Sequence, residues 1–118
     1  MPVYWHYPDL SLRERREQQV SRAIDRDLRV SLGKAMRRQG VKQFWRRCLQ
    51  QLSITELIGR TPDQLRSHLE AQFQPEMRWE TYGQWGIGHI KPCNRFDLAD
   101  PKQLAECAHF SNLQPLWR

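Results

Sequence analysis

The chain lacks the features that mark several protein classes. None of its apolar runs approaches the ~20 residues of a membrane-spanning helix, and the N-terminus shows no basic segment followed by an apolar one, as a secretory signal would. Only three cysteines occur, none in a C-x-x-C pair, which argues against a disulfide framework and against a four-cysteine zinc knuckle. We therefore expect a cytoplasmic, intracellular protein with no membrane contact.

The composition indicates one globular unit. A chain of 118 residues is long enough for a single domain with a modest core. Charged residues make up 27% and apolar residues 39%, which is ordinary for a folded protein and too apolar for a disordered one. No repeat, low-complexity tract or interdomain linker is visible. We expect one domain over residues 1–118.

Positive charge is concentrated in the first half. Residues 1–60 hold 13 Lys and Arg against 6 Asp and Glu, whereas residues 61–118 hold 6 against 7. A basic half joined to a near-neutral half predicts a surface for a polyanion, with nucleic acid, and DNA in particular, as the expected partner. The expected phosphate-binding residues are Arg13, Arg16, Arg22, Arg26, Arg29, Arg37, Arg38, Arg46 and Arg47. The alternative is a solvated helix face on which acidic neighbours pair with some of these arginines.

Apolar periodicity predicts helices in the basic half. The first is expected over residues 12–39, with Ser11 as its N-cap, Glu14 as the capping-box partner and Gly40 as its left-handed end. A stripe of apolar residues four apart marks its buried face: Val20, Ile24, Leu28, Leu32 and Met36. A shorter second helix is expected over residues 42–52.

The second half mixes helices with strands. Thr61-Pro62-Asp63-Gln64 predicts a helix start, because Thr and Gln can form a capping box around a proline at the first position. Residues 85–91 suit a strand that pairs antiparallel with residues 113–117, and Asp100-Pro101 opens a short helix between them, to about residue 108. Trp79, Trp85 and Trp117 are expected in the core. The predicted fold class is α+β.

Several segments of the second half follow one another in a familiar order. They are Leu65-x-x-His68-Leu69-Glu70-x-x-Phe73, Met77-x-Trp79-x-x-Tyr82-Gly83, Trp85-Gly86-Ile87-Gly88-His89-Ile90-Lys91-Pro92, Cys107-x-His109 and Asn112-Leu113-Gln114-Pro115-Leu116-Trp117. In this order and spacing they resemble the phage-type branch of the HNH endonuclease family. Residues 61–118 would then be the HNH-like region, preceded by the Arg-rich helical region.

The resemblance implies a ββα-metal fold and metal-dependent hydrolysis of phosphodiesters. His89 would be the general base that takes a proton from the attacking water, since imidazole can accept a proton at neutral pH. Asn112 would hold the connecting loop so that His89 points at the phosphate. One divalent cation, Mg²⁺ or a similar ion, would stabilise the leaving oxygen through oxygen or imidazole ligands.

Two positions depart from the family pattern. Gly88 stands where the family carries its metal-binding Asp, and Gly86 stands where many relatives carry a His. The sequence ends at Arg118, before the helix that would carry the last metal ligand, so an incomplete ββα hairpin is expected. A further possibility is that the chain is a truncated fragment, which a longer reading frame past Arg118 would reveal.

Two functions follow from these departures. The first is an HNH-type nuclease that works if a divalent cation is still held. The second is a catalytically degenerate, phage-encoded HNH-fold protein that binds nucleic acid or a protein complex. Under the second hypothesis a protein partner or a second copy would cover the hairpin around Leu116 and Trp117.

The sequence offers few metal ligands outside the family pattern. His109 is a candidate ligand, and a structural hydrogen bond is the alternative role for its ring. His89, Cys93, Cys107 and His109 could together form an irregular zinc site. Their spacing matches no recognised zinc motif, and buried free thiols are common, so the sequence favours free cysteines.

Overall fold

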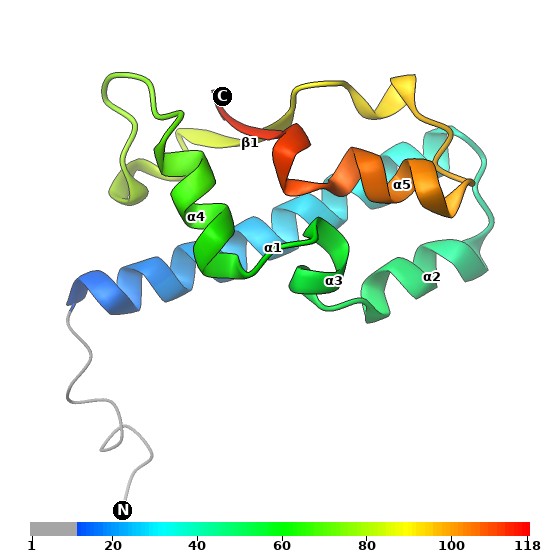
Figure 1. Cartoon of the computed structure of the whole chain (residues 1–118), viewed down its shortest axis with the longest axis horizontal. Helices are drawn as coiled ribbons and strands as arrows, with labels where there is room; N and C mark the ends of the chain where they lie inside the picture. The colour runs from blue at the N-terminus through cyan, green and yellow to red at the C-terminus, as the bar shows by residue number, and fades with distance from the viewer. Residues whose placement is uncertain (1–11) are drawn as a thin grey trace, which may run out of the picture.

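The computed structural model describes residues 12–118, apart from the side chain of Arg13. Within this range five α-helices and one antiparallel pair of strands make an α+β fold, as predicted (Figure 1). In chain order the elements are α1 (Leu12–Arg38), α2 (Gln43–Gln51), α3 (Ile54–Ile58), α4 (Pro62–Glu70), β1 (Trp85–His89), α5 (Pro101–Ala108) and β2 (Leu113–Trp117). None of the helices in this range combines the length and apolar character that crossing a bilayer requires.

Helix α1 is the longest element and extends across most of the molecule, with α4 crossing it at a steep angle (Figure 1). The stripe from Val20 to Met36 is buried, so the periodicity identified the core face correctly. Gly40 ends the helix with φ of 73°, and the N–H of Val41 bonds to the carbonyl of Met36 at 2.9 Å, which satisfies a terminal carbonyl of the helix. The predicted capping box depends on Ser11, which lies outside the described residues.

Helices α2 and α3 follow as a short pair. Helix α2 begins and ends within one residue of its predicted bounds, but Phe44 and Trp45 are 66% and 51% exposed. Helix α3 was not predicted. It begins with a capping box in which the Ser53 hydroxyl accepts from the Glu56 N–H while the Glu56 carboxylate accepts from the Ser53 N–H.

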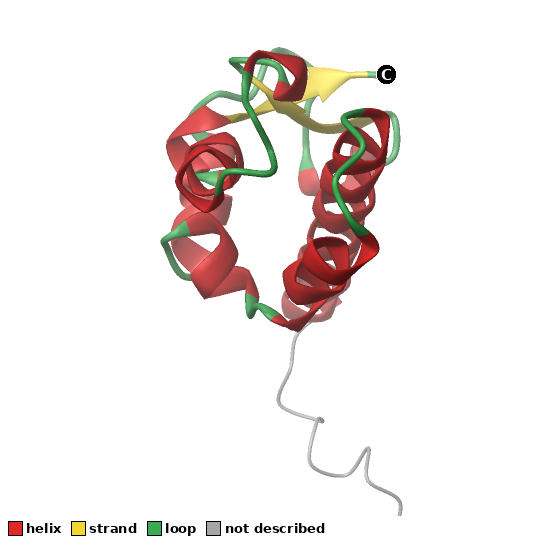
Figure 2. Ribbon diagram, turned by 90° about the vertical axis from the view of Figure 1, so that its right-hand side faces the viewer, coloured by secondary structure: helices red, strands yellow, loops and turns green. Residues whose placement is uncertain are grey.

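The two strands lie across one end of the helical layers (Figure 2). Trp85 is opposite Trp117 and His89 is opposite Leu113 in the antiparallel register. Because successive strand residues point to opposite faces, Trp85, Ile87 and His89 share the inner face. Gly86 and Gly88 share the outer face with Leu116.

An aromatic cluster fixes β1 on the helices. The ring of the fully buried Trp85 lies 5.1 Å from Phe73, 5.6 Å from Trp79 and 4.9 Å from Tyr82, centroid to centroid. The Trp85 indole N–H donates to the carbonyl of Arg78 at 2.8 Å. The prediction of core positions was correct for Trp79 and Trp85 but wrong for Trp117, which is 41% exposed at the C-terminal end of β2.

Candidate functional site

Asn112 ties the chain that leaves β1 to the C-terminal end of α5. Its side-chain oxygen accepts the N–H of Lys91 at 2.8 Å. Its amide nitrogen donates to the carbonyls of Lys91 and Cys107, at 3.1 and 3.0 Å. The side chain thus uses both its donor and its acceptor capacity to hold the chain that leaves His89. Loop fixing is the role that the resemblance implies for Asn112, and its part in catalysis stays a prediction.

His89 lies at the end of β1 beside two thiols. The ligand atoms of His89, Cys93 and Cys107 all lie within 4.8 Å of one another. The two sulfur atoms are 3.3 Å apart, at the distance of a weak S–H···S contact. The Nε2 atom of His89 is buried and has no hydrogen-bond partner among residues 12–118 as the structure describes them. Strand β1, the turn after Pro92 and the C-terminal end of α5 therefore each supply one side chain to this group, which we call the His–Cys–Cys cluster.

The thiols of the cluster differ in acidity. The hydrogen bond from Cys107, helped by the neighbouring His89, lowers the pKa of the Cys93 thiol. Donating that bond raises the pKa of Cys107, and burial raises it further. The pair therefore favours a state in which Cys93 carries the negative charge and Cys107 keeps its proton.

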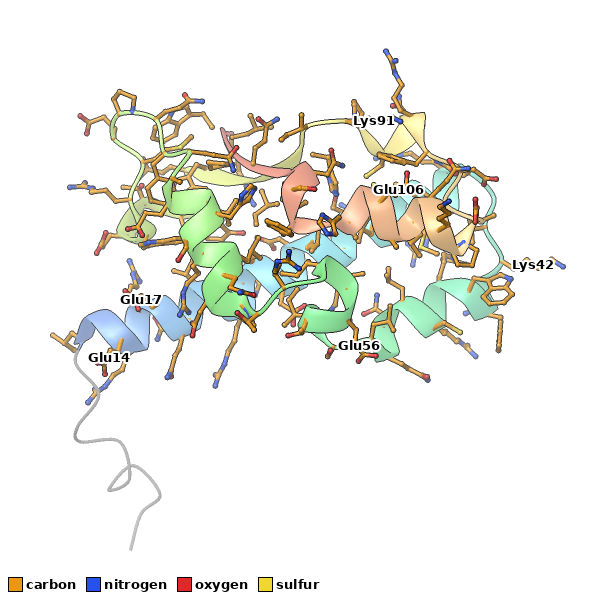
Figure 3. The ribbon with its side chains drawn as sticks, viewed as in Figure 1. Glu14, Glu17, Lys42, Glu56, Lys91 and Glu106 are labelled. Carbon is orange, nitrogen blue, oxygen red and sulfur yellow. The ribbon has the colours of Figure 1, made fainter. Side chains whose placement is uncertain are left out.

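Helix α1 fixes the turn that carries Cys93. The side-chain amide of Gln39 donates to the carbonyls of Cys93 and Phe96, at 3.3 and 2.9 Å, and its oxygen accepts the N–H of Leu98 at 2.9 Å. Lys91, which projects from the same loop in Figure 3, places its ammonium 4.5 Å from the centre of the Phe96 ring. Hydrogen bonds from Gln39 thus hold the turn that carries the Cys93 thiol.

The hard cation implied by the resemblance does not fit these residues. Magnesium prefers carboxylate, carbonyl and water oxygens, whereas the groups around His89 are thiols. Gly88 offers no side chain, and a Cβ there would overlap the Cδ1 atom of Leu116 and approach its Cγ to 2.9 Å. Within residues 12–118, no grouping of three or more His, Cys, Asp or Glu ligands contains a carboxylate.

His109 lies apart from the cluster. Its Nδ1 is 2.7 Å from the hydroxyl of Ser111, and its ring packs on Phe110 with centroids 4.7 Å apart. The opposite edge of the ring faces Gly59, where an added Cβ would be 3.3 Å from Nε2. The structural alternative considered for His109 describes this geometry better than a metal ligand does.

Three of the predicted phosphate-binding arginines are not among those that the structure shows as exposed. Arg29 is engaged inside the fold: it bonds to Asp25 at 2.6 Å and donates to the carbonyls of Leu49 and Leu52, at 3.1 and 2.6 Å, at the end of α2. The sequence groups Arg29 with the phosphate ligands because its carbonyl partners lie twenty and twenty-three residues further along the chain. Arg46 is half-buried, with its Nε unpartnered among the described residues. The side chain of Arg13 lies outside the described residues.

The remaining predicted arginines are exposed: Arg16, Arg22, Arg26, Arg37, Arg38 and Arg47. Arg22, Arg26 and Arg37 are separated by four and eleven residues, spacings that place them on one side of α1, opposite its buried stripe. We call these three residues the basic face. Figure 3 shows Glu14 and Glu17 near the N-terminal end of α1 and Lys42 extending away at the other end.

The sequence raised a grouping of His89, Cys93 and Cys107 with His109 but favoured free cysteines, whereas the structure brings the first three together without His109. Cys93 follows His89 by four residues, but Cys107 lies on a helix whose position is set by tertiary packing. The antiparallel pairing of residues 85–91 with 113–117 was the available signal, because it returns the chain that follows α5 to the end of β1. That pairing limits where Cys107 can lie without specifying a contact.

Comparison with known proteins gives two viral relatives. The chain is 36% identical over 64 residues to uncharacterized protein L426 of Acanthamoeba polyphaga mimivirus. It is 40% identical over 62 residues to uncharacterized protein L246 of the same virus. The matches cover 53% and 52% of this chain but only 28% and 27% of the two relatives. No protein-family model and no solved structure matches the sequence.

Proposed function

We propose that the protein binds DNA through the basic face of α1, on a scaffold that resembles an HNH endonuclease. The observation that carries the proposal is the exposure of Arg22, Arg26 and Arg37 on one side of a single helix. Guanidinium groups pair with phosphate oxygens in a bidentate geometry, so a row of them suits a phosphate backbone. Such contacts position the protein on DNA without reading its sequence.

The acidic residues of α1 leave this face largely basic. Asp25 pairs with the half-buried Arg29, and Asp27 accepts from Tyr82 and Arg118. Arg26 is 3.5 Å from Asp27, but its own side chain is 71% exposed, so this contact is worth little in water. The alternative, in which acidic neighbours on the helix pair with the arginines, therefore describes Arg29 better than it describes the basic face.

A binding titration tests the proposal. Replacing Arg22→Ala and Arg37→Ala together is expected to weaken binding to a labelled DNA duplex several-fold at low salt. It should also reduce the slope of log K against log salt by about 0.9 for each phosphate contact removed. Fluorescence anisotropy at several salt concentrations measures both quantities, and circular dichroism checks that the variant is folded.

The matched control removes the same charge elsewhere. Arg78→Ala with Lys102→Ala takes two exposed cations from the near-neutral half. Equal losses of affinity in the two double variants would mean that net charge, and not the basic face, drives binding. An unchanged affinity after loss of Arg22 and Arg37 would refute the proposal. Tighter binding to an RNA duplex would reassign the partner.

Phosphodiester hydrolysis is the second candidate function. It is favoured by the position of His89 at the end of β1, next to the loop that Asn112 holds. It is disfavoured because the ligand group around His89 in the described residues contains two thiols and no carboxylate. Nicking of supercoiled plasmid with Mg²⁺ or Mn²⁺ separates the two candidates. Cleavage that disappears in His89→Ala and with EDTA would establish a nuclease, and retarded but uncut plasmid would support binding alone.

A further inference from the structure

Three groups that ordinarily ligate soft or borderline metals meet in the His–Cys–Cys cluster. Imidazole nitrogen and thiolate sulfur are the preferred ligands of Zn²⁺, in tetrahedral sites. Cys107 is buried, and His89 and Cys93 are half-buried. The only other cysteine, Cys48, lies on α2 outside the cluster.

The imidazole of His89 distinguishes a metal site from a simple pair of thiols, because its buried Nε2 has no hydrogen-bond partner among the described residues. A buried polar nitrogen without a hydrogen bond is unfavourable, so its presence in the folded protein calls for an explanation. A disulfide between Cys93 and Cys107 would remove their weak S–H···S contact and leave this nitrogen unpartnered. A metal ion between the three groups would engage a ring nitrogen of His89 and both sulfurs together.

We propose that His89, Cys93 and Cys107 bind one Zn²⁺ ion, with water at a fourth coordination position. The protein ligands would be two thiolates and one neutral imidazole, which balance the charge of the ion. Binding forms two Zn–S bonds and one Zn–N bond and sends the thiol protons to solvent, with no change of oxidation state. The site is distinct in ligand type from the oxygen-ligated cation that the family resemblance implies.

The observed geometry is close to what such a site requires. With Zn–S near 2.3 Å and Zn–N near 2.0 Å, the edges of a tetrahedron are about 3.5–3.8 Å. The two sulfurs are 3.3 Å apart, and no pair of ligand atoms in the cluster exceeds 4.8 Å. Shifts of about 1 Å or less, within reach of side-chain rotation, would complete the site.

The site would join three elements of the fold. His89 ends β1, Cys93 opens the turn after Pro92, and Cys107 lies in the last turn of α5. A nitrogen that ligates zinc is not available to accept a proton from water. The zinc-loaded protein is therefore expected to bind DNA without cleaving it through His89, and the zinc proposal does not depend on the DNA-binding one.

Metal content and cobalt spectra test the proposal on the full 118-residue chain. The protein is reduced, stripped with a chelator, and titrated anaerobically with Zn²⁺ or with Co²⁺ as a spectroscopic substitute. We expect one ion per chain and thiolate-to-cobalt charge-transfer absorption in the near ultraviolet, which zinc then displaces. Cys93→Ser should weaken binding at least about hundredfold, because a coordinating thiolate is lost.

Cys48→Ser is the matched control, since it removes a cysteine outside the cluster and should leave both readouts unchanged. If Cys93→Ser fails to fold, His89→Gln provides the second test, with two thiolate bands retained and affinity reduced. The proposal is overturned by sub-stoichiometric zinc, by cobalt spectra without thiolate absorption, or by equal spectra in wild type and Cys93→Ser. A Cys93–Cys107 disulfide that persists under reducing conditions would also overturn it.

Discussion

At the scale of single residues, Asn112 makes three side-chain hydrogen bonds near the candidate site. Its amide joins the backbone on both sides of Lys91 to the end of α5. An amide suits this position because it donates and accepts from one planar group. A carboxylate could accept the Lys91 N–H, but it has no hydrogen to donate to the two carbonyl oxygens and would be repelled by them.

Replacing this side chain tests its structural role. Asn112→Ala is expected to lower the free energy of unfolding by about 2–3 kcal/mol, because it removes three hydrogen bonds and leaves the carbonyl of Cys107 without that partner. Urea denaturation monitored by tryptophan fluorescence measures the change. Asn94→Ala, which alters an exposed asparagine in the same connection, is the control and should change stability by less than about 0.5 kcal/mol.

Arg29 illustrates how one arginine can differ from its neighbours. It lies on the same helix as the basic face, yet its side chain is only 15% exposed and caps the carbonyls at the end of α2. Arg29→Met is expected to destabilise the protein by about 2 kcal/mol, since hydrogen bonds from a charged donor are among the stronger ones.

DNA affinity of folded Arg29→Met should stay within twofold of wild type, measured by the same anisotropy titration. Arg22→Ala is the paired control with the opposite expectation: little change in stability and weaker binding. If Arg29→Met instead loses affinity without losing stability, this residue belongs to the DNA-binding surface after all.

At the scale of elements, the outer face of β1 is occupied by a neighbouring side chain. Leu116 lies over Gly88, while His89 points from the next position toward the inner face. A carboxylate introduced at Gly88 would therefore share neither the face nor the ligands of the His–Cys–Cys cluster.

Gly88→Asp is expected to leave Mg²⁺ and Mn²⁺ binding undetectable in a calorimetric titration. A small loss of stability should accompany the change because Leu116, which is 41% exposed, must rotate away. Gly88→Ala, which adds the Cβ without the carboxylate, is the control for that loss. Stoichiometric, tight Mg²⁺ binding by Gly88→Asp would contradict this view and restore the family-type cation site.

The sequence predicted elements with strong local signals and missed those that depend on distant contacts. Helix α4 follows from Thr61 and Pro62, and α5 from Asp100 and Pro101, because caps and prolines act within one turn. Helix α3 has five residues, too few to show a period, although its Ser53 cap was visible. The capping residues Ser53 and Glu56 were the local signal for this helix.

The candidate site was predicted only in part, for the same physical reason. His89 and Asn112 were singled out through the motif resemblance, and their neighbourhood follows from strand pairing. The sulfur pair at His89 depends on how α5 packs against the rest of the fold, which no short spacing encodes. The separate role of Arg29 likewise depends on where α2 ends.

At the scale of the whole molecule, Asp27 links α1 to the hairpin. Its carboxylate accepts from the Tyr82 hydroxyl at 2.6 Å and from the Arg118 guanidinium at 3.3 Å. Burial raises the pKa of Tyr82 above its ordinary value, and the hydrogen bond to Asp27 raises it further. The neutral hydroxyl is therefore favoured in the folded protein.

Linkage gives this contact a pH dependence. Because the pKa of Tyr82 is higher in the folded state, its contribution is complete below the ordinary tyrosine pKa of about 10 and is lost as pH rises above it. Tyr82→Phe should lower stability by about 1 kcal/mol at pH 7. The difference from wild type should shrink above pH 10, as followed by urea denaturation. A difference that is constant with pH would show that the hydroxyl does not act through its proton.

The order of the aromatic cluster along the chain affects how the protein is made. Strands β1 and β2 are neighbours in space but are connected through residues 90–112. At synthesis rates of ~5–20 residues per second, β2 leaves the ribosome about 1–6 s after β1. Phe73, Trp79 and Tyr82 all precede Trp85, so the growing chain already holds the rings that can receive β1. The Trp85 ring can therefore pack into this cluster before the partner strand is synthesised.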